Sequence, residues 1–296
     1  MRAIILAESS QCDLSPLTNR IPHPLLPLAG KPILTHALEI LHRSSIRNVE
    51  VVAPTLHSEL EYAIDTGPLL GMHVHFAPDM TDLRQSKEHC LIIGLRHLVD
   101  INWNEAIGKL GELKRHTPVP IMMLSSGNPV ALLVSRDFDG NISCDWSDIH
   151  HSAAVHLSFN DNRVINTSSI NEYYDANFSM VKGQFQYLTP AGREFTYGHR
   201  AAPRARIDKE SIFSTHGYFG SNSNVDRSAS LRGNVILGDN VKVDKGACVS
   251  DSIILDNTYI GVNTDCKHAI VSGGLLIKVD SGVSLELNDP VLFGAV

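Results

Sequence analysis

The sequence predicts an α/β fold in two parts, a Rossmann-like domain followed by a left-handed parallel β-helix. Two patterns in the chain predict this arrangement. Over about the first 135 residues, short apolar strand-like runs alternate with amphipathic helix-like runs, as in a parallel sheet covered by helices. From Ile207 to Leu255 every sixth residue is apolar, a period that fits neither a helix nor an ordinary strand. We expect the α/β domain at residues 1–180, a linker at 181–204 and the β-helix at 205–296.

The elements of the first domain follow from hydrophobic periodicity. Strands are predicted at residues 3–7, 49–53, 74–77 and 121–124, and helices at 32–42, 58–64 and 86–98. Pro32 suits the first turn of its helix. Ser58, with Glu61 three residues later, has the spacing of a capping box. In a sheet of this kind we expect ligands at the carboxyl ends of the strands.

The hexapeptide repeat predicts the core of the second domain. The large apolar residue of each short face should point into the coil, which gives roughly three coils of ~18 residues each. The repeat is expected to slip near residues 261–269 and to resume at Val271, Ile277 and Val283 as one more coil. The in-phase positions are Ile207, Phe213, Phe219, Val225, Leu231, Leu237, Val243, Val249 and Leu255.

Composition restricts the function. A chain of 296 residues with 43% hydrophobic and 19% charged residues has the composition of an ordinary globular protein with room for two cores. The net charge of −7 argues against a nucleic-acid partner. No apolar run approaches ~18 residues and no signal peptide is evident, so we expect no membrane insertion. Five scattered cysteines without CxxC spacing predict reduced thiols and a cytoplasmic location.

The first 32 residues resemble the opening of the sugar-1-phosphate nucleotidyltransferases, whose pattern is A-G-G-x-G-T-R-L-x-P-L-T and then P-K-x-L-L-P-V-x-G-K-P. The C-terminal repeats also look like the β-helix that members of this family often carry. The resemblance implies a nucleotidyltransferase domain that forms an NDP-sugar and pyrophosphate from an NTP and a sugar 1-phosphate, with Mg²⁺. The matching positions are Ala7, Leu14, Pro16, Leu17, Thr18, Pro22, Leu25, Leu26, Pro27, Gly30, Lys31 and Pro32.

The residues that carry the chemistry differ from the family pattern. Glu8, Ser9 and Gln11 stand at glycine positions, where backbone N–H groups must approach a phosphate closely. Asp13 replaces the arginine and His23 the lysine of the Pro-Lys pair, so cations that would hold a triphosphate are lost. The vestigial nucleotide-binding positions are therefore Ala7, Glu8, Ser9, Gln11 and Lys31.

The family's two Mg²⁺-binding aspartates are also altered. The resemblance places the first after a glycine at the end of a central strand, where Ser126-Gly127-Asn128 fits, and the second in W-x-D-x-G-T-x-x-x-Y-x-x-A-N. The Tyr173-x-x-Ala176-Asn177 run aligns Asn166 with the second aspartate. Asn128 and Asn166 bring no negative charge to a divalent cation. The glycine-rich loop expected before the first aspartate is replaced by residues 84–89, and only 37 residues lie between the two asparagines.

Several residues leave a structural and a functional interpretation open. Lys31 either meets a phosphate or shapes the turn before a helix. Glu8 and Asp13 are solvated loop carboxylates or a new acid or metal site. His150, His151 and His156, near Asp145 and Asp148, offer zinc ligands, but without helical pairing for His151 or a cysteine partner surface histidines are favoured. Cys12 has no adjacent base, which argues against a catalytic thiol.

These observations favour a degenerate nucleotidyltransferase relative, a catalytically impaired binding, scaffold or regulatory subunit in sugar-nucleotide or cell-surface polysaccharide metabolism. We expect self-association through the β-helix and partnership with an active relative. The alternative is an active nucleotidyltransferase, with Lys31, His23, Asn128 and Asn166 in altered roles and Mg²⁺ as its cofactor. A third possibility is a hexapeptide acyltransferase with His268 as general base.

Overall fold

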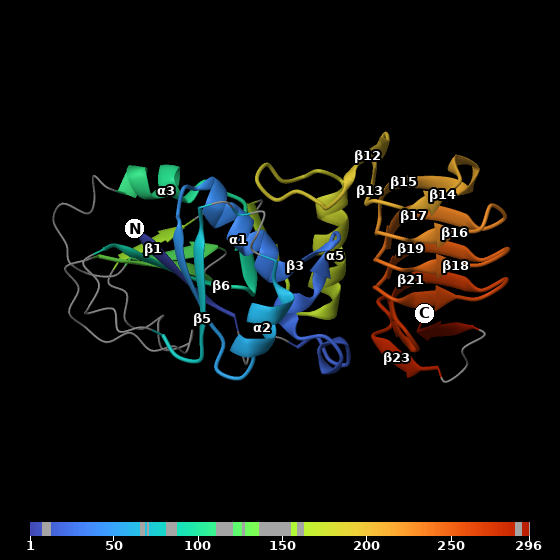
Figure 1. Cartoon of the computed structure of the whole chain (residues 1–296), viewed down its shortest axis with the longest axis horizontal. Helices are drawn as coiled ribbons and strands as arrows, with labels where there is room; N and C mark the ends of the chain where they lie inside the picture. Colours follow the sequence, from blue (N-terminus) through green and yellow to red (C-terminus); the bar gives the residue numbers. More distant parts are fainter. Residues whose placement is uncertain are drawn as a thin grey trace.

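The computed structural model describes residues 1–7, 13–65, 69, 71–80, 88–110, 121–125, 128–135, 155–158, 163–287 and 292–295. It has two halves side by side, a sheet with helices and a stack of short strands, with helix α5 between them (Figure 1). No helix among these residues is long and apolar enough to cross a membrane.

The N-terminal half is built on a seven-stranded sheet in the order β10-β8-β9-β6-β1-β4-β5. Pairing is parallel between β1, β4, β5 and β6 and between β8 and β10, whereas β9 is antiparallel to both of its neighbours. The strands are β1 (Arg2–Leu6), β4 (Asn48–Val52), β5 (His73–Ala77), β6 (Cys90–Gly94), β8 (Ile121–Ser125), β9 (Asn128–Val134) and β10 (Val155–Ser158). The predicted mixed α/β class with a parallel sheet is confirmed.

In the described residues, four helices and two small sheets complete this half. The helices are α1 (Ile33–Arg43), α2 (His57–Ala63), α3 (Trp103–Leu110) and α5 (Ile170–Val181). Short 3₁₀ turns lie at Leu17–Asn19 and His23–Leu25. The small sheets pair β2 (Pro27–Leu28) with β3 (Lys31–Pro32), and β7 (His97–Val99) with β11 (Val164–Asn166). Helix α2 begins after Leu56 without a side-chain cap, so the predicted Ser58 capping box is wrong.

The predicted helix at 86–98 is also wrong, since its described residues contain β6 and β7 instead. Leu91 and Ile92 are both fully buried, one in each of two separate apolar clusters. A central parallel strand is covered on both faces, so it reads as a continuous apolar run that helical spacing can imitate.

The C-terminal half is two sheets of short strands stacked in register (Figure 1). Val225 pairs in parallel with Val243, 18 residues later, and Leu237 with Ile254, 17 residues later. One sheet runs β12 (Arg193–Thr196), β13 (His199–Ala201), β15 (Ile212–Phe219), β17 (Ser230–Leu237), β19 (Cys248–Ile254), β21 (Asp265–Ser272), β22 (Leu275–Lys278) and β23 (Val283–Glu286). The other runs β14 (Arg206–Ile207), β16 (Asn224–Val225), β18 (Lys242–Val243), β20 (Thr258–Ile260) and β24 (Phe293–Ala295), and a 3₁₀ turn lies at Lys209–Ser211. Strands β12 and β13 lie within the predicted linker.

The six-residue period holds from Phe219 to Val249, where every in-phase residue is buried. Phe213, predicted to be internal, is 65% exposed. The phase shifts earlier than predicted, because the coil that pairs Leu237 with Ile254 is one residue short. Ile254 therefore enters the core of the coils, whereas Leu255 packs with the N-terminal half.

The predicted last coil is absent. Strands β22 and β23 turn back as an antiparallel hairpin after β21, and Val283 is 47% exposed. Ile277 packs with the N-terminal half instead of inside the coils.

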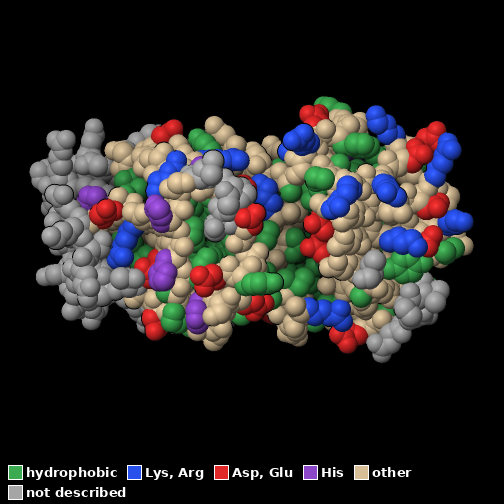
Figure 2. All heavy atoms as spheres, viewed as in Figure 1, with side chains coloured by type: hydrophobic (Ala, Val, Ile, Leu, Met, Phe, Trp, Pro, Cys, Tyr) green, Lys and Arg blue, Asp and Glu red, His purple; other side chains and the backbone are tan. Residues whose placement is uncertain are grey.

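The two halves share one hydrophobic cluster. Side chains from the outer face of the coils, including Tyr218, Ile236 and Ile253, are buried together with those of α1 and α5. Tyr174 of α5 donates a hydrogen bond to the carbonyl oxygen of Asp251 at 2.6 Å. Burial of this apolar area fixes the coils against the α/β half. On the face shown in Figure 2, described Lys and Arg side chains are interspersed with Asp and Glu.

Candidate functional site

The candidate site lies at the carboxyl edge of the N-terminal sheet. Strands β1 and β6 are parallel neighbours, with Leu6 opposite Gly94. The chain therefore leaves both strands on the same edge, where ligands bind in sheets of this kind. Ala7, which follows β1, is buried and donates its N–H to Val52 O at 2.9 Å. Glu8, Ser9, Gln11 and Cys12 lie outside the described residues.

The segment after β11 connects the predicted site residues. Asn166 pairs with His97, and the N–H of Thr167 donates to Arg96 O at 3.0 Å. The N–H of Asp13 donates to Ser168 O at 2.8 Å, and the Asp13 side chain is exposed. The structure thus joins Asp13 and Asn166 to the segment that follows β6.

His23, at the family's lysine position, is held by the same segment. Its Nε2 lies 3.2 Å from Thr167 O and 3.0 Å from Thr167 Oγ1. Because a carbonyl only accepts, Nε2 carries the proton and donates. Burial lowers the pKa of His23 to about 4, against which the hydrogen bond to the Thr167 backbone acts. His23 is therefore neutral at pH 7 and provides no cation for a phosphate.

Asn166 is engaged by its neighbours. Its Nδ2 donates to Glu172 Oε1, and its Oδ1 accepts from the N–H of Ser168 at 3.2 Å and from Ser168 Oγ at 2.6 Å. Ser169 caps α5, accepting from the N–H of Glu172 while its hydroxyl donates to Glu172 Oε2 at 2.9 Å. The amide and the cap form one closed network at the start of α5.

Lys31 forms an ion pair with Glu39 of α1, its Nζ lying 2.8 Å from both carboxylate oxygens. The partner of Lys31 is thus a residue of α1, the helix that begins two residues after Lys31. Of the two interpretations, shaping the entry to α1 matches this contact.

A pocket of about 190 Å³ adjoins Asn166. Its charged lining side chains, among the residues that the structure describes, are the carboxylates of Glu172 and Asp175, without a Lys or Arg. Such a lining repels an anionic ligand.

Asn128 begins β9, the strand beyond β6 as counted from β1. Its side chain lies outside the described residues, and its metal-binding role stays a prediction.

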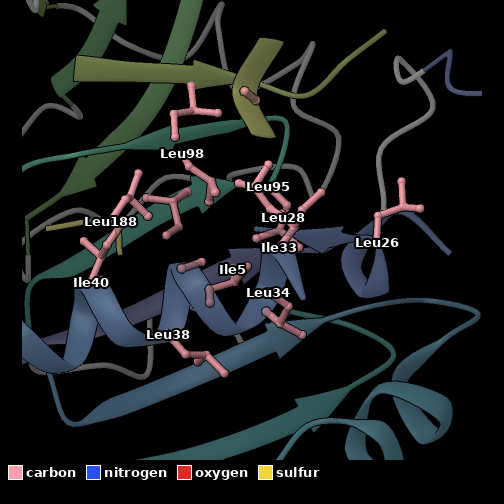
Figure 3. Packing of buried hydrophobic residues seen from close by; sticks show 14 of the residues in the cluster. Ile5, Leu26, Leu28, Ile33, Leu34, Leu38, Ile40, Leu95, Leu98 and Leu188 are labelled. Carbon is pink, nitrogen blue, oxygen red and sulfur yellow. The ribbon is translucent and has the colours of Figure 1, made fainter. Parts of the chain in front are cut away.

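Sequence reasoning missed Gly94-Leu95, which also follows the pattern of a glycine that ends a buried central strand. Leu95 is 2% exposed, in one buried cluster with Leu28 and Ile33 (Figure 3). The carbonyl oxygen of Leu95 accepts a hydrogen bond from Thr167 Oγ1 at 3.3 Å. Leu95 therefore contacts the residue that directly follows Asn166.

The remaining candidates lie apart from this edge. His268 is in β21, with Nδ1 3.6 Å from Asp280 Oδ1. His150 and His151 fall outside the described residues, as does the side chain of His156. Among the described residues no group of three or more His, Cys, Asp or Glu side chains is placed to hold a metal ion.

Comparison with known proteins agrees with this architecture over the N-terminal half. A family model described as nucleotidyl transferase matches residues 2–110. Glucose-1-phosphate thymidylyltransferase of Streptomyces griseus is 30% identical over 93 residues, which are 31% of this chain and 26% of that protein. N-acetylmuramate alpha-1-phosphate uridylyltransferase of Neisseria meningitidis is 30% identical over 79 residues, covering 27% of this chain and 34% of that protein.

A third relative, UTP--glucose-1-phosphate uridylyltransferase of Synechocystis, is 29% identical over 77 residues, 26% of this chain and 20% of that protein. The chain thus matches between a fifth and about a third of the length of these relatives. The matched region contains β1, the following turns, α1 and β6, whereas β11 and α5, which carry Asn166 and Glu172, lie outside it. Residues 2–110 are therefore similar to the nucleotidyl transferase family, and the relatives that this chain matches act on sugar 1-phosphates by their names.

Proposed function

We propose that this protein is a nucleotidyltransferase-family member with degenerate phosphate and metal sites, acting as a catalytically impaired binding, scaffold or regulatory subunit in sugar-nucleotide or cell-surface polysaccharide metabolism. The observation that carries the proposal is Leu95. It follows the glycine that ends β6, beside β1, and is therefore, besides Asn128, a position that fits the family pattern of a glycine followed by a metal-binding aspartate. A buried leucine there offers no ligand atom to a cation.

The family's Mg²⁺ does not fit these residues. Magnesium demands oxygen ligands and is usually held through one or two carboxylates. The second position holds Asn166, whose amide oxygen already accepts two hydrogen bonds from Ser168. The nearest carboxylate, Glu172, accepts from Asn166 and from Ser169. We therefore derive no reaction step through a metal ion.

The cation supply supports the same proposal. His23 is neutral at pH 7 and donates to Thr167, and Lys31 is neutralised by Glu39. A nucleoside triphosphate held near Asn166 would face the carboxylates of Glu172 and Asp175. Neither His23 nor Lys31 would offset this repulsion between negative charges.

The C-terminal half supports a role in assembly. We propose that its coils form the left-handed β-helix that the hexapeptide period predicts, and that the protein self-associates through it or joins an active relative. All four residues of the edge strand β23 are exposed, which leaves a strand edge that association would cover. We also propose that the protein works in the cytoplasm.

The test is a comparison of turnover with binding in the purified full chain. Pyrophosphate and NDP-sugar would be measured with each NTP and sugar 1-phosphate in the presence of Mg²⁺, beside thermal unfolding with the same compounds. We expect no product above that of the heat-denatured protein. A ligand that binds at about 100 times its Kd should still stabilise the fold by about 2.7 kcal/mol.

Variants make the test specific to the metal positions. Asn166→Asp and Leu95→Asp/Asn166→Asp should raise the affinity for Mn²⁺ measured by electron paramagnetic resonance, while Asn171→Asp, on the exposed side of α5, should not. Circular dichroism would show which variants remain folded. Mg²⁺-dependent product formation by the unaltered chain, abolished by EDTA, would overturn the proposal in favour of an active nucleotidyltransferase.

A further inference from the structure

A second pocket, of about 340 Å³, lies at the opposite end of α5 from Asn166. Figure 1 shows α5 leading through the segment that follows it to β12 and β13, at the top of the stacked strands. The pocket is open to solvent between the end of α5, residues 188–190 and the β12–β13 hairpin, and His216 of β15 also lines it. Of the residues that the resemblance assigns to nucleotide or metal binding, those that the structure describes, such as Lys31 and Asn166, do not line it.

The wall formed after α5 is held by a buried carboxylate. Asp100 is 4% exposed and accepts the backbone N–H groups of Gln186, Tyr187 and Leu188 at 2.6–2.8 Å. A carboxylate saturated by backbone donors holds its segment in one conformation. This side of the pocket is therefore formed before any ligand arrives.

The opposite wall presents an oriented arginine. Arg200 donates from Nε to Ala191 O at 3.0 Å and from Nη2 to Gly192 O. No partner is recorded for its Nη1 in the described part of the chain. The hydrogen bonds from Nε and Nη2 thus fix the orientation of the guanidinium. Nη1 is left to donate to a bound oxyanion, a ligand that arginine favours.

One further cation lines the same space. Lys182, directly after α5, is exposed and has no ion-pair partner among the described residues. His216 also lines the pocket, but its Nδ1 is buried and therefore out of reach of a ligand in the pocket. Burial, then the positive charge of Lys182, lowers the pKa of His216, so this side chain adds no cation to the lining.

The rest of the lining adds an apolar floor and an aromatic ring at the mouth. Met180, Phe185 and Leu188 supply the floor, and Tyr197 is 89% exposed. Glu194 is the one carboxylate among the described lining residues, so Lys182 and Arg200 leave a positive balance there. Glu194 can accept from hydroxyl groups, which a sugar would offer.

We propose that this pocket binds a small phosphorylated molecule, with its phosphate on Lys182 and Arg200 and its hydroxyl-bearing or ring portion between Glu194 and Tyr197. A volume of about 340 Å³ suits a ligand of this size. Such a site goes beyond the proposed function, since it lies apart from the positions altered at the sheet edge.

Isothermal titration calorimetry of the full chain with glucose 6-phosphate, inorganic phosphate and glucose tests the proposal. Both phosphates should bind and glucose should not, because the cations recognise the phosphate. Lys182→Gln should weaken both phosphates by about fivefold or more, the scale of one charge-assisted hydrogen bond. Lys267→Gln, the same charge change at an exposed position in β21, should leave the affinity unchanged.

Two further variants separate this pocket from the sheet edge. Arg200→Gln should weaken phosphate binding in a protein that circular dichroism shows to be folded, whereas Asn166→Asp should not alter it. The proposal is overturned if neither phosphate binds, if Lys182→Gln binds as the unaltered chain does, or if Lys267→Gln weakens binding equally.

Discussion

At the scale of single residues, a buried histidine links stability to pH. His36 in α1 is fully buried and donates from Nε2 to Leu28 O at 2.8 Å, while its Nδ1 has no partner among the described residues. Burial lowers the pKa of His36 from 6.5 to about 4, opposed by the hydrogen bond to Leu28. Because the folded pKa lies below the unfolded one, the unfolded chain binds the proton first as pH falls. Stability is therefore present above pH 6.5 and lost as the pH falls from 6.5 toward about 4.

We predict that His36→Gln reduces this pH dependence. Between pH 6.5 and about pH 5, both proteins should lose free energy of unfolding, measured in urea. The loss in His36→Gln should be smaller than the loss in the unaltered chain by on the order of 2 kcal/mol. His75→Gln, at an exposed position of β5, is the matched control and should retain the original slope. Equal slopes in all three proteins would show that His36 is not a buried neutral histidine.

At the scale of elements, the Tyr173-x-x-Ala176-Asn177 run joins α5 to the β2–β3 hairpin. Asn177 is fully buried, accepts the N–H of Ala29 at 2.8 Å and donates to Tyr173 O at 3.0 Å. Tyr173 donates its hydroxyl to Pro27 O at 2.5 Å. Both contacts hold the turn that precedes Lys31. The motif thus acts here through packing and backbone hydrogen bonds.

Asn177→Leu should destabilise the protein by about 1–3 kcal/mol, because it leaves the buried N–H of Ala29 without an acceptor. Asn171→Leu, an exposed asparagine in the same helix, should change stability by less than about 0.5 kcal/mol. Urea denaturation of the two variants measures the difference. If the two variants lose the same free energy of unfolding, the hydrogen bond between Asn177 and Ala29 does not contribute to stability.

The same elements show what the sequence could predict. The Tyr-x-x-Ala-Asn spacing drew attention to Asn166, which pairs with His97 in the segment that follows β6, and its alignment with a metal position stays a prediction. The run around Leu91 and Ile92 was interpreted as helix, since burial on both faces removes the alternation that marks a strand. This misassignment also hid Gly94-Leu95, whose position became clear only when β6 was seen beside β1. The one-residue shift before Ile254 was missed because Leu255 is equally apolar.

At the scale of the whole molecule, the turn at Gly30 in the α/β half packs closely against the coils. Gly30 has φ +87°, and a Cβ there would lie 2.2 Å from Cζ of Tyr218 in β15. Tyr218 is 2% exposed and belongs to the cluster shared by both halves. The glycine of the Gly-Lys-Pro sequence is thus required here by close approach of the second half as well as by backbone conformation.

Gly30→Ala should therefore cost more than conformational strain alone. Gly183→Ala is the matched control, because Gly183 has φ +69° and a Cβ there would meet nothing within 4 Å. We expect about 1 kcal/mol for the control, from the left-handed conformation, and at least about 1–3 kcal/mol more for Gly30→Ala, from overpacking against the ring. In the double variant Gly30→Ala/Tyr218→Ala the collision is gone, so its cost in urea denaturation should be smaller than the sum of the two single costs. Additive costs, or equal costs for Gly30→Ala and Gly183→Ala, would mean that the two halves do not dock through this contact. The contact is supported if the double variant costs less than the sum of its two single variants by the same free energy by which Gly30→Ala costs more than Gly183→Ala.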